Sequence, residues 1–163
     1  MSKLPVKKTK ILFVCLGNIC RSPSAHTIFQ HMVDKKGVSE KYEIDSAGIL
    51  SVHQGEMADA RMRKHADKRG YIITTRSRPV DPVADFEHYD MIIGMDNNNI
   101  KSLRSMTVVD DKKEKISKMT DYCTVFKETE IPDPYYGGFE GFEYVLDLLE
   151  DACNGLLLEL EEV

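Results

Sequence analysis

The stretch ILFVCLGNICRSPSA, residues 11–25, contains the signals from which the fold of this chain follows. Residues 11–14 form a short β-prone run of the kind that makes a fully buried strand. A Gly17-Asn18 turn comes next, and Ser22-Pro23 has the form of an N-cap followed by proline in the first helical turn. Strand, tight loop and helix in this order predict the start of a βαβ unit.

On either side of the loop, strands and helices alternate along the chain. Helical spacing of apolar residues predicts helices from Pro23 to a stop at Gly37, over 57–69, from a cap at Asp96 to Leu103, and over 144–160. β-Prone runs predict strands over 42–46 and 90–95, with 106–109 and 115–119 supplying a further short strand and its approach. The alternation predicts an α/β fold, one domain over residues 1–163, with a mainly parallel sheet covered by helices on both faces.

The loop over residues 15–21 has the composition of an anion-binding site with a nucleophile. Because it joins a strand to a helix, its backbone N–H groups can converge on a ligand together with the positive end of the helix dipole. Gly17 permits a sharp backbone path, and Asn18 tolerates left-handed geometry. A thiolate at Cys15 would be stabilised there, and Arg21 would grip two oxygens of a tetrahedral oxyanion. We expect a phosphate-binding loop between the first strand and the first helix.

Composition excludes several other classes of protein. Lys plus Arg is 22 and Asp plus Glu is 27, and the resulting net charge of −5 argues against a general nucleic-acid binder. The 4 cysteines lack zinc-site spacing and are too few to staple a chain of 163 residues. No apolar run has transmembrane length, so no membrane insertion is expected. These features predict a reduced, cytoplasmic protein.

The same loop carries a resemblance to a known family. Residues 14–25, VCLGNICRSPSA, are similar to the signature of the low-molecular-weight protein-tyrosine phosphatases. The similarity continues through residues 44–48, 76–78, 86–90, 95–96, 99 and 133–137, and so covers almost the whole chain. It implies a four-stranded parallel sheet flanked by helices and hydrolysis of phosphotyrosine without a metal or other cofactor. The expected partner is a phosphotyrosine-containing protein, and the expected state is a monomer or weak homodimer.

The resemblance also implies roles for individual residues. Cys15 is the expected nucleophile that forms a phosphocysteine, and Arg21 is expected to stabilise the transition state. Asp133 is the expected general acid, and then the base that activates water. The residues expected to bind substrate are Leu16, Gly17, Asn18, Ile19, Cys20, Tyr135 and Tyr136. Ser22 and Ser46 are expected to support the loop.

Two further residues lie close to this chemistry. Cys20 shares the loop with Cys15 and either fills space or captures an oxidised Cys15 as a reversible disulfide, which would make the protein redox-sensitive. His53 falls in a predicted loop, where a surface role is expected.

The chain departs from the family pattern at the expected rim of the site. Thr75 stands where members commonly have histidine, and Met57, Ala58 and Ala60 stand in a segment that usually contains prolines. The polar aromatic residue usual near Val52 is missing. These departures leave the substrate preference and the physiological substrate open.

Three other functions stay open on the sequence. An arsenate reductase of the same fold would need a relay of cysteines in mid-chain, and none lies between Cys20 and Cys123. A protein-arginine phosphatase tends to have threonine at the place of Ile19. A non-catalytic phosphotyrosine-binding module would have lost a catalytic residue, and all three are present.

Overall fold

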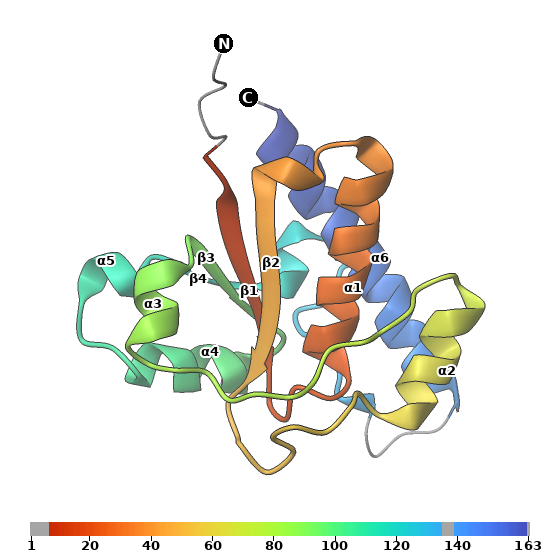
Figure 1. Cartoon of the computed structure of the whole chain (residues 1–163), viewed down its shortest axis with the longest axis horizontal. Coiled ribbons are helices and arrows are strands. Elements are labelled where there is room, and N and C mark those ends of the chain that lie inside the picture. Colours follow the sequence, from red (N-terminus) through yellow and green to blue (C-terminus); the bar gives the residue numbers. More distant parts are fainter. Residues whose placement is uncertain (1–6, 135–138, 163) are drawn as a thin grey trace.

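A parallel sheet of four strands organises the chain, in a computed structural model that describes residues 7–134 and 139–162 (Figure 1). The strands are β1 (Thr9–Cys15), β2 (Tyr42–Gly48), β3 (Met91–Gly94) and β4 (Ile116–Lys118). Their order is β2-β1-β3-β4, and every neighbouring pair is parallel. The predicted four-stranded parallel sheet is therefore confirmed.

Strand β1 is apolar throughout because both of its faces are buried. Ile11 and Phe13 point into one core with α1 (Arg21–Lys36) and α6 (Phe139–Glu161). Leu12 and Val14 point into a second core on the other face. That second face is covered by α3 (Ala84–His88) and α4 (Asn97–Ser105), which lie opposite α1 and α6 in Figure 1. The predicted covering of both faces is confirmed.

Shorter elements complete the connections between the strands. They are the 3₁₀ helices η1 (Ser39–Lys41) and η2 (Met119–Tyr122) and the α-helices α2 (Ala60–Lys68) and α5 (Asp110–Lys113). Helix α2 packs against α6, as Figure 1 shows.

Local signals placed some helix boundaries correctly. Gly37 ends α1 with a φ of 75°, and Asp96 caps α4 by accepting a hydrogen bond from the Asn99 N–H. The predicted helix over 57–69 begins later, at Ala60, because the Asp59 side chain accepts hydrogen bonds from the first amides of α2.

Two further boundary predictions were wrong. Ser22 is not the N-cap of the first helix: α1 begins at Arg21, and the cap position, Cys20, makes no side-chain hydrogen bond there. Residues 106–109 form no strand, since the fourth strand is made by Ile116–Lys118 alone. In both cases a contact distant in sequence decided the structure. The Ser22 hydroxyl lies against the Ala47 carbonyl group at the site, and β4 pairs with β3.

Candidate active site

The loop between β1 and α1 is fixed by hydrogen bonds that its backbone carbonyl groups accept from neighbouring segments. The acceptors are the carbonyl oxygens of Cys15, Leu16, Gly17 and Ile19, and their donors are Ile49 N–H, Leu50 N–H, Ser77 Oγ and Asp59 N–H. Among the described residues, none accepts a hydrogen bond from the amides of residues 16–20. Backbone amides rarely lack a partner in folded proteins, so this row of donors is suited to an anionic ligand.

The side chain of Asn18 fixes the shape of this loop. Asn18 has a φ of 56° and is only 2% exposed. Its Nδ2 donates to Ser22 Oγ at 2.8 Å and to Ser46 Oγ at 3.0 Å, and its Oδ1 accepts from the Arg78 N–H at 3.0 Å. The predicted supporting residues Ser22 and Ser46 are therefore brought together by Asn18. These bonds hold a left-handed backbone that asparagine tolerates better than most residues.

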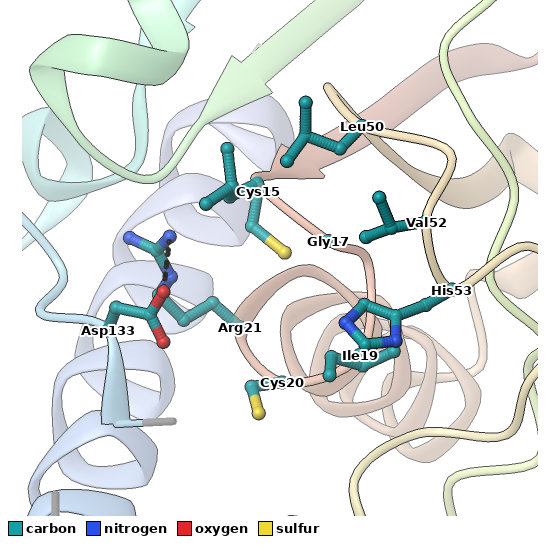
Figure 2. A pocket seen from close by; sticks show the side chains of 10 residues that line it. Cys15, Gly17, Ile19, Cys20, Arg21, Leu50, Val52, His53 and Asp133 are labelled. Carbon is teal, nitrogen blue, oxygen red and sulfur yellow. Dashed lines mark ion pairs between the residues drawn. The ribbon is translucent and has the colours of Figure 1, made fainter. Parts of the chain in front are cut away.

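Cys15 lies at the end of β1 with its sulfur directed into the pocket (Figure 2). Its Sγ is 3.1 Å from Ser22 Oγ, which also lies 3.3 Å from the carbonyl oxygen of Ala47. A hydroxyl has one hydrogen, so Ser22 donates either to Ala47 or to the sulfur. Because Asn18 occupies one lone pair of the hydroxyl, a Cys15 thiol can donate to the other, whereas a thiolate would accept the Ser22 hydrogen. The arrangement accommodates both protonation states of Cys15.

Arg21 is a buried cation beside the pocket, with 2% of its surface exposed. Its Nη1 donates to Asp96 Oδ2 at 2.6 Å and to the carbonyl oxygen of Ile131 at 3.0 Å. Burial by itself lowers the pKa of Arg21, but the nearby Cys15, Asp96 and Asp133 outweigh it and raise the pKa above its ordinary value. Arg21 is therefore held as a cation in a fixed direction.

Asp96 is a further residue of the site, for which the sequence predicted the role of a helix cap but no contact with Arg21. The carboxylate performs both tasks: one oxygen caps α4 and the other accepts from Arg21. Its position directly after β3 was the available signal, since the carboxyl ends of neighbouring parallel strands meet at one edge of the sheet.

Asp133 reaches the same pocket from a segment distant in sequence. Its Oδ2 is 3.6 Å from Arg21 Nη2, and its side chain remains 34% exposed. The preceding segment is anchored because the Ile131 N–H donates to the carbonyl oxygen of Met95 at 2.9 Å. Figure 2 shows Asp133 and Arg21 on one side of the pocket.

The pocket has a volume of about 130 Å³ and walls that are largely apolar. Its lining, part of which Figure 2 shows, consists of Cys15, Leu16, Gly17, Ile19, Cys20, Arg21, Leu50, Val52, His53 and Asp133. The predicted substrate-binding residues 16, 17, 19 and 20 line the pocket, whereas Asn18 supports it from behind. Tyr135 and Tyr136, the predicted aromatic wall, lie outside the described residues.

His53 lines the pocket, so the surface role expected for it was incomplete. Its Nδ1 is 2.6 Å from Glu56 Oε2, and a Cβ added at Gly17 would lie 3.0 Å from His53 Cδ2. The imidazole thus packs directly on the loop, a contact that Gly17 permits by lacking a side chain. The contact with Gly17 joins two segments that are distant in sequence, so it could not be identified from local sequence.

Cys20 differs sharply from Cys15 in its environment. Burial raises the pKa of the Cys20 thiol well above its usual range, and the charges of Asp59, Cys15 and Asp133 raise it further. Cys20 is therefore a protonated thiol at neutral pH. All four cysteines are reduced, and in the view of Figure 2 the Cys20 sulfur points away from that of Cys15.

Two negative findings apply to the described ranges, 7–134 and 139–162. Within them, no group of three or more His, Cys, Asp or Glu side chains is arranged to hold a metal ion. No helix in that part of the chain combines the length and apolar character needed to cross a membrane.

Comparison with known proteins gives a consistent result. The family model described as low molecular weight phosphotyrosine protein phosphatase matches residues 10–163. A low molecular weight protein-tyrosine-phosphatase of Streptomyces coelicolor is 35% identical over 155 residues, which cover 94% of each chain.

Solved structures show the same similarity. A protein tyrosine phosphatase from Entamoeba histolytica, solved with Hepes in its active site, is 50% identical with a TM-score of 0.92, covering 95% of this chain and 98% of that one. The arginine phosphatase of Drosophila is 30% identical with a TM-score of 0.87, covering 94% and 99%. The fold thus occurs in phosphatases that are named for different phosphorylated residues.

The role of Asn18 can be tested by binding of inorganic phosphate. We expect Asn18→Gly to weaken binding by up to roughly 150-fold, because three hydrogen bonds worth about 1 kcal/mol each no longer hold the loop. Asn18→Ala should bind still more weakly, because a positive φ costs alanine roughly 1–2 kcal/mol. Isothermal titration calorimetry measures both, with the exposed Asn98→Ala as control. Wild-type affinity in Asn18→Gly would contradict this role.

Proposed function

Because the chain belongs to the low molecular weight phosphotyrosine protein phosphatase family, we propose that it hydrolyses phosphotyrosine in proteins at the Cys15 pocket, through a phosphocysteine. The chain is a protein-tyrosine phosphatase. One observation carries the proposal: a cysteine, a row of backbone amides that donate to none of the described residues, a buried arginine and an exposed carboxylate meet in one small pocket. We take residues 1–163 to act as one phosphatase domain.

In the first step, the Cys15 thiolate attacks phosphorus and the bond from phosphorus to the phenolic oxygen breaks. The amides of residues 16–20 and the Arg21 guanidinium would then donate to the phosphoryl oxygens, whose negative charge is spread in the transition state. Asp96 keeps Arg21 in this orientation before substrate arrives, so little reorganisation is needed during the reaction.

Asp133 supplies the proton that the leaving phenolate needs. Protonated Asp133 donates it as the P–O bond breaks, and the resulting carboxylate then takes a proton from the water that attacks the phosphocysteine. The second step releases phosphate and regenerates the Cys15 thiolate, which Ser22 stabilises by donating its hydroxyl hydrogen. The exposure of Asp133 allows water to reach it between the two steps.

Two rival activities are disfavoured by the residues present. A cysteine relay for arsenate reduction would need further thiols in mid-chain, and none lies between Cys20 and Cys123. Hydrolysis of phosphoarginine would require hydrogen-bond acceptors for the guanidinium, whereas Ile19 presents an apolar side chain to the pocket. An apolar wall suits the phenyl ring of phosphotyrosine.

Replacement of the nucleophile tests the covalent mechanism. We expect Cys15→Ser to lose all but a few per cent of turnover of p-nitrophenyl phosphate, because an alcohol is a poor nucleophile, yet to bind inorganic phosphate measurably. EDTA should leave the wild-type rate unchanged. Substantial activity in Cys15→Ser, or full loss with EDTA, would disprove a metal-independent phosphocysteine mechanism.

Replacement of Asp133 tests general acid catalysis. Asp133→Asn should reduce kcat/KM for a phosphotyrosine peptide by roughly 10²–10⁴-fold. The loss should be smaller for p-nitrophenyl phosphate, whose leaving group needs little protonation. Equal losses for the two substrates would show that Asp133 is not the acid.

We also propose that the protein works in the cytoplasm and that oxidation regulates it. Peroxide would convert Cys15 to a sulfenic acid, and the Cys20 thiol would displace water from it to form a disulfide. The buried, protonated state of Cys20 requires the loop to relax first, so the bridge would be strained and easily reduced. Without Cys20, a second peroxide would oxidise the uncaptured sulfenic acid to a sulfinic acid, which dithiothreitol does not reduce. Dithiothreitol should therefore restore activity in the wild type and in Cys123→Ser but not in Cys20→Ser. Equal recovery of all three would refute the capture by Cys20.

A further inference from the structure

Helix α2 is connected to the phosphate loop through its N-cap residue, Asp59. The Asp59 N–H donates to the carbonyl oxygen of Ile19 at 2.8 Å, and the Asp59 carboxylate caps α2. The beginning of α2 and the loop that carries Cys15 therefore move together. This junction contains no residue to which the proposed mechanism assigns a proton or phosphoryl transfer.

The other side of α2 is tied to the first turns of α6 through Phe142. This ring is 1% exposed and stacks on the His65 imidazole, with centroids 5.4 Å apart and an interplanar angle of 6°. The Arg61 guanidinium lies 4.9 Å from the centroid of the same ring. His65 Nδ1 is 2.5 Å from Glu143 Oε2, and Arg69 pairs with Glu143 at 3.0 Å.

The first turn of α6 in turn contacts the residue that follows Asp133. Pro134 is buried, and a Cβ added at Gly141 would lie 3.8 Å from Pro134 Cβ, so Pro134 packs beside the first turn of α6. On its other side Asp133 is fixed through Ile131, whose carbonyl oxygen accepts from Arg21. Asp133 is thus held between two anchors, one on the phosphate loop and one on α6.

We propose that Arg61, Phe142 and His65 are positioning residues for Asp133: through α2 and α6, their stack sets the distance between the carboxyl group and the phosphate loop. The inference rests on the proposed role of Asp133 as general acid. Proton transfer is sensitive to displacements well below 1 Å, so a small shift of α6 would reduce the rate of leaving-group departure. Phe142 and His65 do not line the pocket, so the attack of Cys15 should be little affected.

The leaving group separates positioning of the acid from a merely structural role. We would measure kcat/KM, which reports the step up to phosphoenzyme formation, for phenyl phosphate and for p-nitrophenyl phosphate. Phe142→Leu and His65→Leu should lose about tenfold on phenyl phosphate and no more than about twofold on p-nitrophenyl phosphate. His65→Phe should recover most of the loss, because it keeps the stacked ring.

A control variant on the same interface strengthens the comparison. Tyr71 donates to Glu150, farther along α6 and away from Pro134. Tyr71→Phe removes this bond between α6 and the segment that follows α2. It should leave the ratio of the kcat/KM values for the two substrates unchanged. If Phe142→Leu does not fold, the pair His65→Leu and His65→Phe carries the test.

Double variants distinguish failure of this inference from failure of the proposed function. In the Asp133→Asn background, Phe142→Leu and His65→Leu should cause no further loss on phenyl phosphate, since no acid remains to be positioned. Equal losses on the two substrates, or losses that persist without Asp133, would overturn the positioning role while leaving Asp133 as the acid. If Asp133→Asn itself does not discriminate between the substrates, the acid assignment falls and this inference falls with it.

Discussion

The three hydrogen bonds of the Asn18 side chain are the constraint on which the site depends. They connect the phosphate loop to α1 through Ser22, to β2 through Ser46 and to the segment after α2 through Arg78. With Asn18 held at a φ of 56°, the carbonyl groups of the loop bond outward, and none of the described residues occupies the amides of residues 16–20. One buried amide side chain therefore maintains a backbone that is unfavourable by itself but presents donors to an anion.

The proposed anion site lies in a chain whose net charge is −5. A net negative charge does not attract an anion from a distance, so the local donors would have to supply the binding. Arg21 is buried, and a buried charge is tolerated only with a partner, which explains its contact with Asp96. Asp133 lies farther from Arg21 and remains partly exposed, so it is the carboxylate that can exchange protons with water.

The two cysteines of the loop, Cys15 and Cys20, have different surroundings and therefore different chemistry. Cys15 lies at the strand end beside Ser22, where a hydroxyl can donate to a thiolate. Cys20 is surrounded by negative charge and apolar atoms, so its thiol stays protonated. Around them the rim is mainly aliphatic: Leu50 and Val52 are 42% and 72% exposed. A substrate with an apolar residue beside its phosphotyrosine would bury part of that surface.

The positions of the loop, the sheet and most helices could be predicted from sequence, since they depend on signals a few residues apart. The run over 11–14, the turn at Gly17-Asn18 and the stop at Gly37 each act through local backbone preferences, and β1, the loop and α1 lie where they indicate. The chemistry of Cys15 and Arg21 followed because both belong to this loop. Asp133 was found by resemblance alone, since Pro and Asp also favour ordinary turns.

The tertiary structure decided which side chains meet. Ser22 resembles a helix cap by sequence, but folding directs its hydroxyl to Cys15 and Ala47. Asp96 and Asp133 reach Arg21 across 75 and 112 residues of chain, and His53 reaches Gly17 from the loop after β2. Side-chain hydrogen bonds and ion pairs have no sequence period, because their partners are set by the packing of helices on the two faces of the sheet. Local preference therefore determined the backbone of the phosphate loop, whereas long-range packing determined which carboxylates lie beside Arg21 and which side chains form the walls of the pocket.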